Sequence, residues 1–236
     1  MEMIRNIIYD VGYVLVTYTW RDAFRRFGYD EAGVKRMSDQ LFGSRDPKSI
    51  RTYWEKYDMN EVSDREIEEY CYSHFPEDRK ALEWFFEDPS VWGKIMNDLA
   101  DTIPVMKAKG YGIYLLSNYP ERLWKCHLGS APFRKDLDGA VVSFEEGCGK
   151  PEERFYRILL DRYHLRPEEC LFLDDRPVNT DMAEKIGIHT ITVNTPDKRK
   201  EAVVYLESLP DLAKKDTRCF PGTGRKARQP EQARQP

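Results

Sequence analysis

Short apolar runs that stop at polar residues recur along this chain and predict the strands of a parallel sheet. The first covers residues 7–9 and is followed directly by Asp10, by a glycine two residues later and by a second apolar run at 14–16. A continuous apolar run bounded by a breaker is typical of a strand buried on both faces. Four later runs have the same character, at residues 112–118, 139–142, 170–173 and 189–193.

Segments with helical periodicity separate these runs. Helices are expected over residues 95–109, 121–128, 151–164, 179–186 and 201–208. Pro104 should disturb the first of them, and glycines at 110 and 187 should end the first and the fourth. Strands that alternate with helices indicate an α/β fold with a Rossmann-like, doubly wound parallel sheet.

Residues 18–91 break this alternation, because they are rich in aromatic and charged residues and show no alternating strand pattern. Short helices are expected over 20–27, 31–42, 48–57 and 80–86. Another begins after Ser63, which can form a capping box with Glu66. The predicted organisation is therefore a catalytic core of residues 1–17 and 92–213, with an all-helical cap inserted at 18–91.

Charge is unevenly distributed along the chain. The formal charge is −4, but residues 214–236 hold seven Lys or Arg and two Asp or Glu, so this tail carries +5 and the remainder carries −9. The net charge of −9 on residues 1–213 argues against general nucleic-acid binding. The tail lacks apolar periodicity, and we expect it to be a disordered basic extension.

The sequence also indicates the cellular compartment. No run approaches the about 18 apolar residues of a membrane span, and the N-terminus lacks a basic start with an apolar signal core. Five scattered cysteines without CxxC spacing indicate neither a disulfide framework nor a zinc site. We expect a cytoplasmic protein, monomer or homodimer, without nucleic-acid or membrane partners.

Polar residues at the predicted strand ends carry the candidate chemistry. They are Asp10, Ser117 with Asn118, Lys150, and Asp174 with Asp175. Because parallel strands end at one edge of a sheet, these sites are expected to converge. A carboxylate can form an acyl phosphate, hydroxyl and ammonium groups can hold phosphoryl oxygens, and paired acids can bind Mg²⁺. The set suits phosphoryl transfer.

These motifs resemble those of the haloacid dehalogenase-like hydrolases, in the subgroup whose helical cap follows the first strand. The matching pieces are YDVGYVL at 9–15, LLSN at 115–118, GKP at 149–151 and LFLDD at 171–175, with Asn179 and Gly187. Within that family the chain is similar to sugar-phosphate phosphatases, including those that act on α-D-glucose 1-phosphate, which share the Asp-x-Gly start and the paired acids.

The resemblance implies roles for the residues around the phosphoryl group. Asp10 would be the nucleophile. Ser117 would bind the phosphoryl group, helped by the backbone of Asn118, and Lys150 would bridge nucleophile and phosphate.

The resemblance also implies Mg²⁺ as the cofactor. Its ligands would be Asp10, the backbone carbonyl of Gly12 and Asp175, with support from Asp174. Asn179 stands where many relatives carry a further acid, so it would act through water or from the second coordination sphere.

Gly12 departs from the family pattern, in which most phosphatases have a second Asp as general acid and base. Three accounts stay open: a water on the metal, a group from the cap or Tyr13, or a weak enzyme. General acid–base catalysis is worth about 10²–10⁴-fold. A slower enzyme, or one that prefers good leaving groups, is therefore expected.

The leading hypothesis is a Mg²⁺-dependent hydrolase that removes phosphate from a small phosphorylated metabolite, with sugar phosphates as the first class, through an aspartyl-phosphate on Asp10. One alternative is a haloacid-type dehalogenase with the same nucleophile, although halide displacement needs no metal and the paired acids argue against it. The other is a phosphate-ligand-binding protein with little turnover, which Gly12 motivates.

Overall fold

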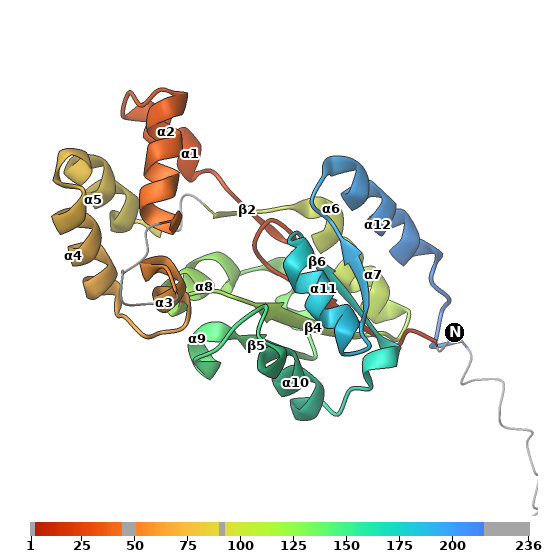
Figure 1. Ribbon diagram of the computed structural model, residues 1–236. Helices are drawn as coiled ribbons and strands as arrows, with labels where there is room; N and C mark the ends of the chain where they lie inside the picture. Colours follow the sequence, from red (N-terminus) through yellow and green to blue (C-terminus); the bar gives the residue numbers. More distant parts are fainter. Residues whose placement is uncertain (1–2, 44–50, 90–92, 215–236) are drawn as a thin grey trace, which may run out of the picture.

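A five-stranded parallel sheet forms the centre of the protein in the computed structural model, which describes residues 3–43, 51–89 and 93–214 (Figure 1). The spatial order is β5-β4-β1-β6-β7. β1 lies in the middle, with Tyr9 opposite Leu115 on one side and Leu173 on the other. This confirms the expected α/β fold. The strands are β1 (Asn6–Tyr9), β4 (Gly112–Ser117), β5 (Gly139–Val142), β6 (Cys170–Asp174) and β7 (His189–Thr192).

Alternation along β1 separates two hydrophobic cores, because successive side chains of a strand point to opposite faces. Ile7 and Tyr9 join the core under α6, α7 and α12, whereas Ile8 joins the core under α10 and α11. The sheet is thus covered on both faces, as predicted. The helices are α6 (Asn97–Ala100), α7 (Thr102–Ala108), α10 (Glu153–Arg162), α11 (Pro177–Lys185) and α12 (Pro196–Ser208).

The predicted helix over 95–109 is wrong at its start. Residues Gly93–Ile95 form β3, which pairs antiparallel with β2 (Val16–Tyr18) in a separate two-stranded ribbon. Strands of three residues are too short to show alternation, and their pairing joins segments far apart in the sequence. The remainder of the segment forms two helices, α6 and α7. Pro104 lies in the first turn of α7, where its missing N–H needs no partner.

Helix α12 begins at Pro196, five positions before the predicted start. Thr195 caps it by accepting a hydrogen bond from the Lys198 amide at 3.2 Å. The first turn of this helix is charged and exposed, so the apolar pattern did not reveal it. The shorter connecting elements are α8 (Glu121–Leu128), η4 (Pro132–Asp136), α9 (Ser143–Glu146) and η5 (Pro167–Glu169), and α8 has its predicted bounds.

The helices between β2 and β3 gather at one side of the sheet (Figure 1). The capping box at Ser63 and Glu66 is present, and Thr52 and Glu55 form a second one that was not predicted. The predicted helix over 31–42 is α-helical only to Ser38 and continues as a π-helical turn. These elements are α1 (Trp20–Arg26), α2 (Glu31–Ser38), η1 (Asp39–Gly43), α3 (Tyr53–Asp58), α4 (Asp64–His74), η2 (Pro76–Asp78) and α5 (Arg79–Glu87).

Some predictions concern residues outside the described ranges. The first part of the expected helix over 48–57 and the basic tail beyond Lys214 are among them. Within the described part of the chain, no helix combines the length and the apolar character needed to cross a membrane.

Candidate active site

Asp10 lies just beyond the end of β1 and is held from three directions. Its Oδ1 atom accepts hydrogen bonds from the Val11 amide at 2.6 Å and from the Ser117 hydroxyl at 2.7 Å. The Lys150 ammonium forms an ion pair with the same atom at 2.7 Å. The structure thus brings three of the predicted sites together. Because all three contacts fall on Oδ1, they leave Oδ2 available for attack on an electrophile.

Burial shapes the electrostatics of this group. Asp10 is 6% exposed, and burial raises its pKa above the usual range, while the Lys150 charge opposes the shift. For Lys150, burial alone lowers the pKa, but Asp10 and Asp174 outweigh it and raise the pKa above the usual value. Lys150 therefore stays charged, and its charge favours the ionised carboxylate that a nucleophile requires.

Asn118 positions Lys150 through its side chain. Asn118 Oδ1 accepts a hydrogen bond from the Lys150 amide at 2.8 Å, and Asn118 Nδ2 donates to the Lys150 carbonyl at 2.9 Å. Both polar ends of the side chain are therefore engaged with one peptide unit. What Asn118 can offer a substrate is its backbone amide.

Three carboxylates meet beside Asp10. Asp10, Asp174 and Asp175 can each place one oxygen within 4.8 Å of the others. Asp174 is fully buried, and its oxygens accept from the Arg176 amide at 2.8 Å, from Lys150 at 2.7 Å and from Asn179. Asp175 is half-buried, and burial together with Asp174 raises its pKa. Negative charges at such spacing favour a cation among them.

Asn179 adds a second sign of a cation site. It is 2% exposed, and its Nδ2 donates to Asp174, yet its Oδ1 is buried without a hydrogen-bond partner among the described residues. A buried acceptor without a partner in the protein is rare, and an ion or an ordered water typically supplies the missing contact. Carboxylate and amide oxygens are the donors that Mg²⁺ prefers. The residues present therefore fit this ion.

A phenol fills the space beside Gly12. A Cβ atom on Gly12 would lie 3.2 Å from the Tyr18 hydroxyl oxygen. Tyr18 donates a hydrogen bond to Tyr119. The Tyr119 hydroxyl lies 2.8 Å from His127 Nδ1, and His127 Nε2 donates to the Pro89 carbonyl at 2.8 Å. This series of hydrogen bonds was not predicted from the sequence, because its residues come from separate elements and match no spacing motif.

Arg199 secures the turn that follows Asp10. Its guanidinium donates to the carbonyls of Tyr13 at 2.7 Å and Val14 at 2.8 Å, and it also pairs with Asp98. Tyr13 adopts a left-handed backbone conformation with φ of 54°, which is unusual for a residue with a side chain. The sequence gives no signal for Arg199, since it looks like one of several charged residues on an exposed helix.

Two cavities adjoin at the site. The first, of about 630 Å³, is bounded by the core groups around Asp10 and by residues of the cap. The second, of about 330 Å³, has a largely aromatic wall. Tyr13, Asp58 and Asn118 line both. The first cavity is lined by Asp10, Gly12, Tyr13, Arg51, Glu55, Asp58, Met59, Asn118, Lys150, Pro151, Glu152, Asp175, Arg176 and Asn179. The second includes Tyr18, Trp20, Arg21, Phe42, Trp54, Tyr119 and Leu123.

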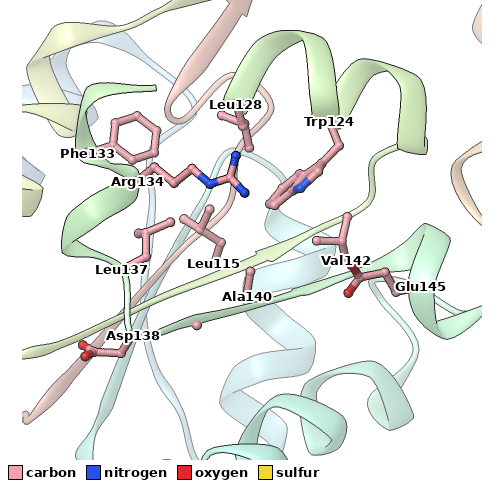
Figure 2. A pocket seen from close by; sticks show the side chains of 11 residues that line it. Leu115, Trp124, Leu128, Phe133, Arg134, Leu137, Asp138, Ala140, Val142 and Glu145 are labelled. Atoms are coloured by element: carbon pink, nitrogen blue, oxygen red, sulfur yellow. The ribbon is translucent and has the colours of Figure 1, made fainter. Parts of the chain in front are cut away.

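A separate hollow of about 290 Å³ lies between α8, η4 and the sheet edge. Figure 2 shows Arg134 reaching in among apolar side chains there, with Trp124 opposite it. None of the residues that meet around Asp10 lines this hollow. It therefore does not contribute to the predicted chemistry.

Comparison with known sequences agrees with this geometry. The sequence model for the haloacid dehalogenase-like hydrolases matches residues 8–187, most of the chain. The chain belongs to this family.

Its relatives include hydrolases of more than one kind. The chain is 26% identical over 220 residues to D-ribitol-5-phosphate phosphatase of Bacteroides thetaiotaomicron, covering 87% of this chain and 100% of that protein. It is 36% identical over 116 residues to acyl-CoA dehydrogenase family member 10 of Mus musculus, but that match spans 47% of this chain and only 10% of the mouse protein. It is 25% identical over 145 residues to (S)-2-haloacid dehalogenase 4A of Burkholderia cepacia, covering 61% and 63% of the two chains.

Solved structures of the family share the fold. One is a haloacid dehalogenase family enzyme from Bacteroides thetaiotaomicron in complex with magnesium and inorganic phosphate, with a TM-score of 0.63 and 20% identity over 80% of this chain and 93% of that one. Another is a hydrolase of the family from Porphyromonas gingivalis, with a TM-score of 0.64 and 26% identity over 88% and 99% of the two chains.

Proposed function

We propose that this protein is a Mg²⁺-dependent phosphomonoesterase that acts on small phosphorylated metabolites through an aspartyl-phosphate on Asp10. The observation that carries the proposal is the meeting of Asp10, Ser117, Lys150 and the acids after β6 at one end of a cavity that cap residues help to line. Nucleophile, phosphate donors and a cation site are then within reach of one substrate.

In this proposal the chain's own groups bind and orient the phosphate. Asp10 attacks phosphorus with Oδ2, because Oδ1 is held by three donors. The Ser117 hydroxyl, the Asn118 amide and the Lys150 ammonium bind phosphoryl oxygens, whose charge they offset. Their existing bonds to Asp10, and between Asn118 and Lys150, fix these groups before the substrate arrives.

The cation supplies positive charge that offsets the repulsion between the carboxylates and a phosphate. Asp10, the Gly12 carbonyl and Asp175 are the residues proposed to hold it. Asp174 and Asn179 would orient them, since Asp174 is already occupied by Lys150 and Asn179.

A sugar phosphate is the first substrate class to test. One relative, which the match covers over its full length, is a phosphatase of a sugar-alcohol phosphate. The aromatic walls of the second cavity can stack on the apolar face of a sugar, and Arg21 adds a donor there. The four cysteines of the described ranges are free thiols, which fits the proposed cytoplasmic setting.

Dehalogenation is the second candidate function, since other relatives carry that name and a glycine at 12 would not hinder a reaction without a proton donor. The cation-binding features oppose it, because three clustered acids and a buried orphan acceptor serve no purpose in metal-free halide displacement. Halide release from 2-haloacids distinguishes the two.

The test is hydrolysis of p-nitrophenyl phosphate and a panel of sugar phosphates, with Mg²⁺ and with EDTA, by the wild type, by Asp10→Asn and by the control Asp197→Asn. Asp197 is an exposed carboxylate on α12, remote from Asp10 in sequence and outside both cavities. We expect EDTA and Asp10→Asn each to abolish turnover and the control to retain it. Metal-independent turnover contradicts the proposal, and phosphate binding without turnover on any ester indicates the binding-protein alternative.

A further inference from the structure

The proposed phosphatase needs a proton for its leaving group, and Gly12 cannot supply one. The inference below rests on the proposed function and adds a residue to it. An alkoxide is a poor leaving group, so an ester of a sugar or other alcohol requires a general acid close to the ester oxygen. The required group must reach the boundary between the phosphoryl group and the remainder of the substrate.

That boundary can be located from the two adjoining cavities. The first contains Asp10, Lys150 and Asp175, so the phosphoryl group belongs there. The second is the aromatic cavity, which suits the leaving group. The ester oxygen joins the two parts and therefore lies where the cavities meet. The residues that line both cavities are Tyr13, Asp58 and Asn118.

Of these three residues, Asp58 is the one with a carboxyl group. Asn118 has both ends of its amide bonded to the Lys150 peptide. The Tyr13 hydroxyl accepts a hydrogen bond from Arg21 at 3.1 Å, and its side chain is 38% exposed. Asp58 is the last residue of α3, so the cap presents it to the core.

Asp58 is docked against the core at a fixed place. Its backbone carbonyl accepts a hydrogen bond from the Ser143 hydroxyl at 2.5 Å. Ser143 opens α9 and also accepts from the Tyr119 amide at 2.9 Å. The Asp58 carboxyl accepts from the Trp54 indole. The contact with Ser143 fixes the Asp58 backbone and the Trp54 indole orients its carboxyl, so this side chain has a defined position.

The surroundings of this carboxyl favour its neutral form. Burial raises the pKa of Asp58 well above the usual value, the Glu55 charge raises it further, and Arg176 opposes them. The charge of Asp58 in turn raises the pKa values of the phenols of Tyr18, Tyr57 and Tyr119. The charge of Asp10 acts on two of these phenols as well, so the nucleophile and Asp58 share one electrostatic environment.

We propose that Asp58 is the general acid of the reaction and takes the place of the carboxylate that most phosphatases of the family carry two residues after the nucleophile, where this chain has Gly12. In the first step Asp10 Oδ2 forms a bond to phosphorus, the bond from phosphorus to the ester oxygen breaks, and the Asp58 proton moves to that oxygen. In the second step the Asp58 carboxylate takes a proton from the attacking water. The water oxygen bonds to phosphorus, the bond from Asp10 to phosphorus breaks, and both carboxyl groups return to their starting states.

The test compares Asp58→Asn with the wild type on two esters. p-Nitrophenyl phosphate has a leaving group that needs no proton, whereas ribitol 5-phosphate has one that does. We expect Asp58→Asn to lose about 10²–10⁴-fold in kcat/KM on the alkyl ester and no more than a few-fold in kcat/KM on the aryl ester, because kcat/KM reports the transfer to Asp10 and not the later hydrolysis that both esters share. Asp58→Glu should recover part of the loss, since it keeps the acid.

Glu69→Gln is the matched control, because it removes an exposed carboxylate of the cap that lines neither cavity. It should retain the ratio of alkyl to aryl turnover. Glu55→Gln gives a second measurement, and a Gln there keeps the capping box. Because Glu55 raises the pKa of Asp58, the alkaline limb of the alkyl-ester profile should also move to lower pH. This measurement needs no change at Asp58, so it holds even where Asp58→Asn fails to fold.

The outcomes distinguish the role of Asp58 from the proposed phosphatase activity. Equal losses of kcat/KM on both esters, no loss of kcat/KM on either, or an unmoved alkaline limb in Glu55→Gln overturn the role of Asp58 and leave the proposed phosphatase activity unaffected. A wild type that hydrolyses neither ester nor the wider panel overturns the proposed function, and the role of Asp58 with it.

Discussion

The Tyr18 hydroxyl oxygen lies 3.2 Å from the place that a Cβ atom on Gly12 would occupy. This is tighter than ordinary van der Waals contact, and Tyr18 cannot move freely because it is half-buried, packs against Tyr119 and is hydrogen-bonded to it. The glycine and the tyrosine therefore form a matched pair. A side chain at position 12 would meet the phenol of Tyr18, which already fills its space.

Gly12→Asp alone should not improve the enzyme. Overpacking against Tyr18 is expected to cost about 1–3 kcal/mol of unfolding free energy, measurable by urea denaturation, and turnover on an alkyl phosphate should not rise. Combining it with Tyr18→Phe removes the hydroxyl that the new side chain meets and should recover part of the stability. In an Asp58→Asn background, the pair Gly12→Asp and Tyr18→Phe should raise alkyl-ester turnover above that of Asp58→Asn. Improvement by Gly12→Asp alone would contradict this packing argument.

Lys150 holds two buried carboxylates, with its Nζ 2.7 Å from both Asp10 and Asp174. Lys150→Met leaves both without a counter-charge, and breaking a buried ion pair typically costs about 3–5 kcal/mol. We expect a lower Tm in EDTA and a larger rise in Tm on adding Mg²⁺ than the wild type shows, because the cation then offsets more repulsion. Lys125→Met, at an exposed position on α8, is the control and should respond to Mg²⁺ as the wild type does.

The meeting of Asp10 with Ser117 and Asp174 could be predicted from the sequence because these residues lie at strand ends. Asp10, Ser117 and Asp174 each lie at or just beyond the end of a strand, and a parallel sheet puts those ends side by side. Each prediction needed only a local apolar run and the residue that follows it. Lys150 required one more element, the loop before α10, and its ion pairs with Asp10 and Asp174 show that this loop returns to the same edge.

The remainder depended on contacts between distant segments. Asp58 ends a short cap helix, and nothing in its local pattern distinguishes it from the other acids of that region. Its position is set by Ser143, which is 85 residues away in sequence. The ribbon of β2 and β3, which includes Tyr18, was also not predicted, because the cap separates its two strands in the sequence. Periodicity reports which face of an element is apolar and does not report which element that face meets.

Asp174 and Asp175 should respond differently to amidation. Asp175 is half-buried and has its pKa raised by burial and by Asp174, so Asp175→Asn should weaken Mg²⁺ activation at least about tenfold while leaving the Tm in EDTA equal or higher. Asp174 accepts from Lys150, Asn179 and the Arg176 amide, so Asp174→Asn should lower the Tm in EDTA as well. Titration of activity with Mg²⁺ and thermal denaturation of both variants provide the comparison, and equal Tm losses would contradict the division of roles.

Arg199 links stability to the geometry of the turn after the nucleophile. Arg199 is 7% exposed. Its guanidinium donates hydrogen bonds to the carbonyls of Tyr13 and Val14 and to the Asp98 carboxylate. Arg199→Lys keeps the charge but cannot make this fork of contacts, so we expect both lower kcat and a loss of about 1–3 kcal/mol of unfolding free energy, from the buried carbonyls left unpaired.

The pH dependence of that loss gives the sharper test. Burial raises the pKa of Asp98, but its hydrogen bonds to Arg199 and to the Leu99 amide outweigh burial and hold the pKa below the usual value. A carboxyl with a depressed folded pKa contributes stability above its unfolded pKa of about 3.9, and that contribution disappears as the pH falls through the folded pKa. The stability difference between wild type and Arg199→Met should therefore be largest at neutral pH and shrink in acid. Denaturation at pH 7 and at pH values below about 4 measures it, with Asp98→Asn as the partner in a double-mutant cycle. A difference that stays constant across this range would mean that Arg199 acts through the two carbonyls alone.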